Sequence, residues 1–182
     1  TRNGTNAEFI TVPAVNALRK PANLSFEEAA SMPLVFLTAW TMLIDRAQLR
    51  AGETVLVLAA GSGVGSAAVQ IARLWGATVI ATASSDEKLE RLRELGLDHG
   101  INYAAEGFAE RARELTDGRG VDAAFDHIVG PNFTALFRSL ADFGTLVFYN
   151  VHNQPPDADV YEEMSRLSTK SLALRCFNIH TY

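Results

Sequence analysis

The sequence predicts an α/β fold built on one doubly wound parallel sheet, and three observations support this prediction. From residue 54 onward, apolar runs of strand length alternate with helical patterns of about ten residues, which is typical of consecutive βαβ units. A glycine-rich turn joins the first apolar run directly to a helical pattern. Six strand-like runs follow one another to the end of the chain, and the doubly wound dinucleotide-binding fold has this number of strands.

The segment before the first central strand is expected to contain a short strand and two helices. Residues 9–12 form an apolar run closed by proline, which we interpret as a strand, and residues 13–24 have the composition of a connector. Ser25 and Glu28 have the spacing of a capping box, which predicts the start of a short helix. A longer helix is expected over residues 33–47.

The remaining elements alternate regularly. Apolar runs predict the strands, periodic apolar residues predict the helices, and glycine-containing turns separate them. A second capping box, from Ser84 to Glu87, is expected to start one of these helices. The predicted strands are residues 54–58, 78–82, 99–102, 121–126, 145–149 and 171–177, and the predicted helices are residues 64–75, 84–95, 108–115, 131–140 and 160–167.

Composition and charge disfavour several classes of function. The chain has 182 residues, enough for one sizeable domain, and a net charge of −5 without a basic stripe, so we expect no nucleic-acid partner. No apolar run is long enough to span a bilayer and the start has no signal-peptide character, so we expect no membrane partner and a cytoplasmic location. The single cysteine, Cys176, rules out an intrachain disulfide and a cysteine-cluster metal site.

The turn after the first central strand carries the clearest functional signal. Gly61 and Gly63 match the first half of the GxGxxG dinucleotide fingerprint, but the third glycine is Gly65, one position early. Glycines allow a sharp turn and a close approach to a pyrophosphate, and the N–H groups at the start of the helix bind the anion. A tight packing turn is the alternative interpretation. The candidate cofactor-binding residues here are Gly61, Ser62, Gly63 and Val64.

Short segments along nearly the whole chain resemble one enzyme superfamily. They are Leu24–Ala30, Leu37–Trp40, Leu49–Val57, Gly63–Ala72, Gly76–Ala77, Asn102–Tyr103, Gly118–Asp122 and Phe125–Asp126. In this order and spacing they resemble the medium-chain dehydrogenase/reductase superfamily, in its zinc-independent quinone-oxidoreductase-like branch. The resemblance implies that residues 25–182 are a Rossmann cofactor domain and that residues 1–24 are a connector and remnant of a GroES-like substrate domain. We therefore expect the chain to be a cofactor-domain fragment.

The end of the second central strand bears on the choice of cofactor. It reads Thr-Ala-Ser-Ser over residues 82–85, without the carboxylate that would bind a ribose 2′-OH. Ser84, Lys88 and Tyr103 resemble the positions that the superfamily uses around the 2′-phosphate of NADPH, and a hydroxyl plus a cation suits a dianion. Because Asp86 is an acidic residue nearby, NADH remains an alternative cofactor. Ser84 could instead be only a helix cap, and Lys88 only a solvated helix residue. We expect NADPH, with NADH less favoured.

The resemblance also indicates a nicotinamide end. Thr38 matches a threonine near the nicotinamide, and Phe148, Tyr149 and Asn150 match a turn beside it, although the superfamily usually has glycine where this chain has Asn150. Tyr149 could donate a proton or stack, and His127 could act as a general acid or be an ordinary loop residue. No catalytic residue is assigned.

The resemblance implies a hydride-transfer reaction without metal. Leu34 stands where zinc-dependent relatives place a cysteine ligand, and aliphatic carbon cannot bind a metal, so we expect no zinc site. We expect an NADPH-dependent reductase of quinones or other activated enones, with a small-molecule substrate. An alcohol or aldehyde oxidoreductase, the enoyl-reductase module of a larger synthase and a non-catalytic NADPH-binding module are the alternatives. A homodimer through the edge strand at residues 171–177 is also expected.

Overall fold

The computed structural model describes residues 7–127, 130–149 and 155–179. Contacts divide the chain into two compact units, Thr1–Pro33 and Leu34–Tyr182. The first unit contains the 3-10 turn η1 (Ala14–Asn16) and helix α1 (Phe26–Ser31). The capping box of α1 is confirmed, because the Ser25 hydroxyl accepts from the N–H of Glu28 and the Glu28 carboxylate accepts from the N–H of Ser25.

The predicted strand at residues 9–12 is wrong. These residues form no regular element, and the Phe9 side chain is 91% exposed. A strand needs a neighbour that pairs with its N–H and C=O groups, and no described segment pairs with this one. An apolar run without a partner strand is therefore insufficient to form a strand.

The second unit is an α/β domain, as predicted, around a six-stranded parallel sheet with the order β3-β2-β1-β4-β5-β6. The chain starts in the middle, winds outward to β3, crosses back and winds outward to β6, which is the doubly wound order. The strands are β1 (Thr54–Val57), β2 (Thr78–Ala83), β3 (His99–Asn102), β4 (Val121–Asp126), β5 (Leu140–Tyr149) and β6 (Ala173–Phe177).

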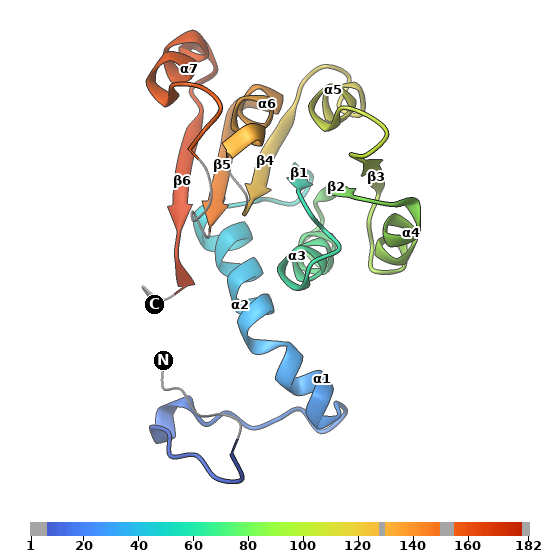
Figure 1. Cartoon of the computed structure of the whole chain (residues 1–182), viewed down its shortest axis with the longest axis vertical. Helices are drawn as coiled ribbons and strands as arrows, with labels where there is room; N and C mark the ends of the chain where they lie inside the picture. The colour runs from blue at the N-terminus through green and yellow to red at the C-terminus, as the bar shows by residue number, and fades with distance from the viewer. Residues whose placement is uncertain (1–6, 128–129, 150–154, 180–182) are drawn as a thin grey trace. The chain divides into compact units, whose positions relative to one another are not determined.

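Helices cover both faces of this sheet (Figure 1). One apolar cluster joins the sheet to α2 (Pro33–Trp40), its continuation η2 (Thr41–Arg46, a π-helix), α3 (Gly63–Leu74) and α4 (Asp86–Glu94). The other joins the opposite face to α5 (Phe108–Glu114), α6 (Phe133–Ser139) and α7 (Val160–Arg166). The short 3-10 turns η3 (Gly130–Asn132) and η4 (Ser168–Lys170) precede α6 and β6.

Two details of the predicted helices are corrected. The residue that caps α4 is Ser85, whose hydroxyl accepts from the N–H of Lys88, and not Ser84. Adjacent serines offer the same cap chemistry, and the extended backbone of Ser85 selects it. The helix predicted over residues 64–75 ends at Leu74, which is 88% exposed, and the indole N–H of Trp75 beyond it donates to the Leu49 carbonyl at 2.9 Å.

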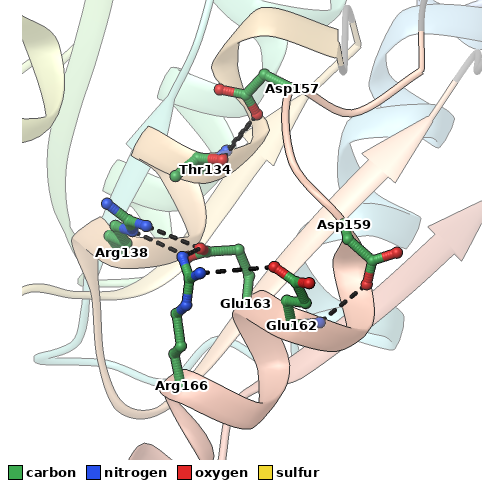
Figure 2. A network of polar contacts seen from close by, with 7 residues as sticks. All are labelled: Thr134, Arg138, Asp157, Asp159, Glu162, Glu163 and Arg166. Atoms are coloured by element: carbon green, nitrogen blue, oxygen red, sulfur yellow. Dashed lines mark hydrogen bonds and ion pairs between the residues drawn. The ribbon is translucent and has the colours of Figure 1, made fainter.

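A buried carboxylate fastens α7 to α6 (Figure 2). Glu163 of α7 is 1% exposed and accepts two hydrogen bonds from the guanidinium of Arg138 of α6, at 2.9 and 2.7 Å. Arg166 adds a third, at 2.8 Å. Nearby, Asp157 accepts from the backbone N–H and the hydroxyl of Thr134, near the start of α6. These bonds join α6 to α7 and to the segment that precedes α7.

The parallel register brings the carboxyl ends of all six strands to one edge. Ala83 of β2 lies opposite Asn102 of β3, and Asp126 of β4 lies opposite Phe148 of β5. Ligands of doubly wound sheets bind outside this edge, where the winding direction reverses. That reversal lies between β1 and β4, beside the glycine turn.

Candidate cofactor-binding site

The glycine turn packs so closely that Gly65 has no room for a side chain. A Cβ on Gly65 would lie 2.6 Å from the Ala59 oxygen and from the Ala60 Cα. The start of α3 therefore sits directly on the end of β1. Ser62 caps this helix, since its hydroxyl accepts from the N–H of Gly65 at 3.1 Å. The N–H groups of Gly63 and Val64 have no acceptor within the helix, and such groups at the start of a helix can bind an anion.

The second strand holds the turn in place. The Ala59 N–H donates to the Thr82 hydroxyl at 3.2 Å, and the Ala60 N–H donates to the Thr82 carbonyl at 2.9 Å. Thr82 itself is buried, at 1% exposure. The turn is thus preorganised from both ends, by β2 and by α3. Sequence reasoning missed this role of Thr82, although a hydroxyl near the end of an otherwise apolar strand was a visible signal.

Lys88 connects the glycine turn to the end of β2. Its Nζ donates to the Ser84 hydroxyl at 2.9 Å, and its Cδ would lie 3.4 Å from a Cβ built on Gly61. The cation therefore stands next to a hydroxyl on the β1 side of β2, and both side chains are exposed. The structure brings together Ser84 and Lys88, two of the three residues that the sequence analysis expected around a 2′-phosphate, and it places Lys88 next to Gly61 of the glycine turn. A 2′-phosphate would meet a charge-assisted donor at this place.

Tyr103 and Asp86 lie next to the same subsite. The N–H of Tyr103 donates to the Ala83 carbonyl at 3.2 Å, and its side chain is 52% exposed beyond the end of β3. Asp86 is the acidic residue because of which NADH remained an alternative cofactor. Its carboxylate accepts a hydrogen bond from the Asn102 side-chain amide at 3.0 Å. Sequence reasoning did not anticipate this partner, because the bond joins α4 to a strand sixteen residues away in the chain.

Thr38 is buried on the face of the sheet that also carries the glycine turn. It lies in α2, is 5% exposed, and its hydroxyl donates to the Leu34 carbonyl at 2.7 Å. One turn earlier, Val35 approaches the start of α3, where its Cγ1 would lie 3.1 Å from a Cβ on Gly63. Val35 and Tyr149 pack against the same apolar cluster, so α2 and the end of β5 border one side of the sheet.

Tyr149, at the end of β5, is paired with His127, just after β4. Their rings lie 5.9 Å apart at 34°, and the Nδ1 of His127 is buried without a hydrogen-bond partner in the described part of the chain. Burial raises the pKa of Tyr149 to about 12, and the negative charge of Asp126 contributes. The phenol therefore keeps its proton at neutral pH and can donate a hydrogen bond. Asp126, which is 2% exposed, lies in register with Phe148 and lines a cavity on the opposite face of the sheet from Tyr149.

Phe148 points away from this group. Its side chain lines an apolar cavity of about 240 Å³ on the opposite face of the sheet, together with Phe133, Leu146 and Leu174. Successive side chains of a strand alternate between faces, so Phe148 and Tyr149 cannot share one surface. Only the backbone of Phe148 remains a candidate contact. Asn150, the third residue of this predicted turn, lies outside the described residues.

Neither a metal cluster nor a membrane-spanning helix occurs among the described residues. Within residues 7–127, 130–149 and 155–179, no three His, Cys, Asp or Glu side chains gather closely enough to hold a metal ion. Leu34 is 63% exposed in α2. In the same described ranges, no helix has the length and hydrophobicity that a membrane crossing requires.

A glycine turn that opens a helix at the reversal point of a doubly wound sheet is typical of a dinucleotide-binding domain. A family model for zinc-binding dehydrogenases matches residues 63–180. The chain belongs to this family, and it is a cofactor domain of the medium-chain dehydrogenase/reductase superfamily.

Solved structures of the superfamily match the fold closely. An NAD-dependent alcohol dehydrogenase is 40% identical, with a TM-score of 0.88 over 96% of this chain and 50% of that one. The CurK enoyl reductase is 34% identical, with a TM-score of 0.79, and the match covers 90% of this chain and 48% of that one. A quinone oxidoreductase of Pseudomonas syringae pv. Tomato DC3000 is 30% identical, with a TM-score of 0.84, and the match covers 94% of this chain and 52% of that one.

Curated relatives of the chain include polyketide synthases. A mycocerosic acid synthase-like polyketide synthase of Mycolicibacterium smegmatis is 37% identical over 145 residues, which are 80% of this chain and 7% of that protein. The chain spans 5–8% of the curated relatives that it matches and about half of the three solved structures above.

Proposed function

We propose that this chain is the cofactor domain of an NADPH-dependent reductase of activated carbon–carbon double bonds. The substrate class is an enone or an enoyl thioester, such as a polyketide synthase module would present. Similarity to CurK enoyl reductase and to polyketide synthases supports this class. The reaction adds a hydride to the β-carbon and a proton to the α-carbon of the double bond.

The observation that carries the NADPH assignment is the pairing of Lys88 with Ser84. The amino group is held 2.9 Å from the hydroxyl beside the glycine turn, and the nearby carboxylate of Asp86 is bonded elsewhere. A cation and a hydroxyl stabilise a phosphate dianion, whereas a ribose 2′-OH calls for an acidic acceptor. The fit favours NADPH over NADH.

NADPH supplies the hydride, and the residues of this chain bind and orient the cofactor. The N–H groups of Gly63 and Val64 would hold the pyrophosphate at the start of α3. Ser84 and Lys88 would bind the 2′-phosphate, with Tyr103 beside them. Thr38 and Tyr149 would border the nicotinamide, and the buried phenol of Tyr149 stays protonated there. We propose that no zinc takes part, since Leu34 offers no ligand atom.

Quinone reduction is the second candidate, and the Pseudomonas quinone oxidoreductase supports it. Alcohol or aldehyde chemistry is a third, supported by the alcohol dehydrogenase. A quinone and an enoyl thioester both accept hydride at a conjugated carbon, whereas an aldehyde accepts it at the carbonyl carbon. The three substrates can therefore be compared directly with one cofactor.

The test is a substrate panel with a longer protein in which this domain is joined to its substrate-binding partner. NADPH oxidation is followed with an enoyl thioester, a benzoquinone and an aldehyde, and with NADH in place of NADPH. We expect the highest kcat/KM with the enoyl thioester and NADPH. Turnover confined to the aldehyde, or equal rates with both cofactors, would refute the proposal, and binding of NADPH without any turnover would favour a non-catalytic module.

A further inference from the structure

Two opposite charges in the first turn of α4 are turned to opposite sides of β2. The β2 strand lies between β1 and β3 in the sheet. Lys88 extends toward β1, where its chain packs over Gly61 and its Nζ binds Ser84. Asp86 extends toward β3, where its carboxylate accepts from Asn102, the last residue of that strand.

The hydrogen bonds of the Asn102 side chain keep Asp86 on the β3 side of β2, away from Lys88. Its Oδ1 accepts from the N–H of Ala104 at 3.1 Å, which leaves the Nδ2 amide to donate to Asp86 at 3.0 Å. The opposite amide orientation would place one oxygen against the carboxylate and an N–H₂ against an N–H, losing both bonds. The backbone of Asn102 is held in register with Ala83 of β2. The side chain therefore has one arrangement that satisfies both of its partners.

We propose that Asn102 is a specificity-determining residue for the 2′ group of the cofactor. By holding the Asp86 carboxylate on the β3 side, Asn102 leaves the β1 side of the subsite to Lys88 and Ser84. A released carboxylate would accept a ribose 2′-OH and repel a 2′-phosphate. This inference rests on the proposed NADPH function and adds to it the residue that keeps the acid away.

The test replaces Asn102 by leucine, which has a similar size and no donor. NADPH and NADH are titrated by calorimetry against the wild-type chain and the Asn102→Leu variant. We expect the NADPH-to-NADH affinity ratio to fall about fivefold, the size of a single exposed charge interaction. The change should be larger at low ionic strength, because salt screens exposed charges. Thermal unfolding of each variant identifies any general loss of folding.

A double-mutant cycle with Asp86→Asn separates this effect from other consequences of the substitution. In the Asp86→Asn background, Asn102→Leu should leave the ratio unchanged, because no carboxylate remains to be released. A fall of the same size in that background would overturn the inference, since Asn102 would then act through the segment at Tyr103 and Ala104. Wild-type preference for NADPH with an unchanged ratio in Asn102→Leu would overturn this inference alone. Binding of neither cofactor, or equal wild-type affinities, would overturn the proposed function together with it.

Discussion

At the scale of single residues, Lys88 should decide between the two nicotinamide cofactors. In Lys88→Ala the 2′-phosphate would lose a charge-assisted hydrogen bond, which is worth about 1.5–3 kcal/mol. We therefore predict that the affinity for NADPH falls roughly ten- to hundredfold, while the affinity for NADH is nearly unchanged. Calorimetric titration of both cofactors measures the two effects.

Arg91→Ala is the matched control for the lysine. Arg91 is an exposed cation on the same helix, and its guanidinium is paired with Glu87 at 2.8 Å. Its removal changes the net charge equally and leaves Ser84 and Lys88 intact, so it should leave NADPH binding nearly unchanged. An equal loss of affinity in both variants would mean that general charge, and not a contact of Lys88, drives binding.

Gly65 should be the glycine that tolerates substitution least in the turn. The Cβ of Gly65→Ala would meet backbone atoms at 2.6 Å, and overpacking of this kind costs about 1–3 kcal/mol. Alanine gains at most roughly 1 kcal/mol in helix propensity, so we predict a net loss of stability in chemical denaturation. Gly61→Ala is the control, because its Cβ would meet only the Lys88 side chain, at 3.4 Å. Similar denaturation midpoints for the two variants would contradict the packing argument.

At the scale of elements, the attachment of α7 to α6 should depend on pH (Figure 2). Hydrogen bonds from Arg138, assisted by its charge and by Arg166, hold the pKa of Glu163 below its ordinary value of 4.5. A carboxylate whose pKa is lower in the folded state stabilises the fold above its unfolded pKa. This stabilisation is lost as the pH falls through the folded pKa.

Glu163→Gln measures this contribution. Glutamine has the shape of a protonated glutamate, so the variant should unfold at a lower temperature than the wild type near neutral pH. The two melting temperatures should converge in acid, below the folded pKa of Glu163. Glu162→Gln is the control, since the side chain of Glu162 is 66% exposed and its carboxylate accepts a long hydrogen bond from Arg166, at 3.5 Å. If the difference in melting temperature between the wild type and Glu163→Gln stayed constant from neutral pH into acid, the charge of Glu163 would not contribute to stability.

The elements also show how far sequence patterns reach. The strand at Val121–Asp126 was predicted with its observed bounds, because buried parallel strands are short apolar runs bounded by turns. The edge strand His99–Asn102 also has its predicted bounds, although only Ile101 in it is buried. Residues 9–12 have the same local pattern but no partner strand. The family resemblance predicted one subsite from Ser84, Lys88 and Tyr103, and the structure joins Lys88 to Ser84. Local pattern could not predict the face occupied by Phe148 or the bond between Asp86 and Asn102, which depend on tertiary register.

At the scale of the whole molecule, the chain alone should be a poor catalyst. It spans about half of the solved oxidoreductases that it matches, and hydride transfer requires the substrate to be held against the nicotinamide. We predict that the isolated chain binds NADPH but oxidises it with an enoyl thioester far more slowly than a longer protein containing the same domain. Comparable kcat/KM values for the two would show that the 182 residues suffice.

The outer edge of the sheet offers a surface for self-association. β6 pairs with β5 on one side, and no described strand pairs with its other side. Phe177 is buried against the sheet face, whereas Cys176 is exposed. An unpaired parallel edge without proline exposes N–H and C=O groups that another strand can bind. A two-fold axis would let two β6 strands pair antiparallel and remove the edge from both chains.

We therefore predict a homodimer formed through β6, with about twice the monomer mass of 19.7 kDa in light scattering. Proline removes a backbone donor, and donors of neighbouring residues in a strand point to opposite sides. One of Ala173→Pro and Leu174→Pro should thus remove a donor from the free edge and yield a folded monomer, while the other weakens the pairing of β6 with β5 and lowers the melting temperature. Circular dichroism distinguishes the two effects. A wild-type chain that remains monomeric at high concentration, or a dimer unaffected by either proline, would exclude this interface.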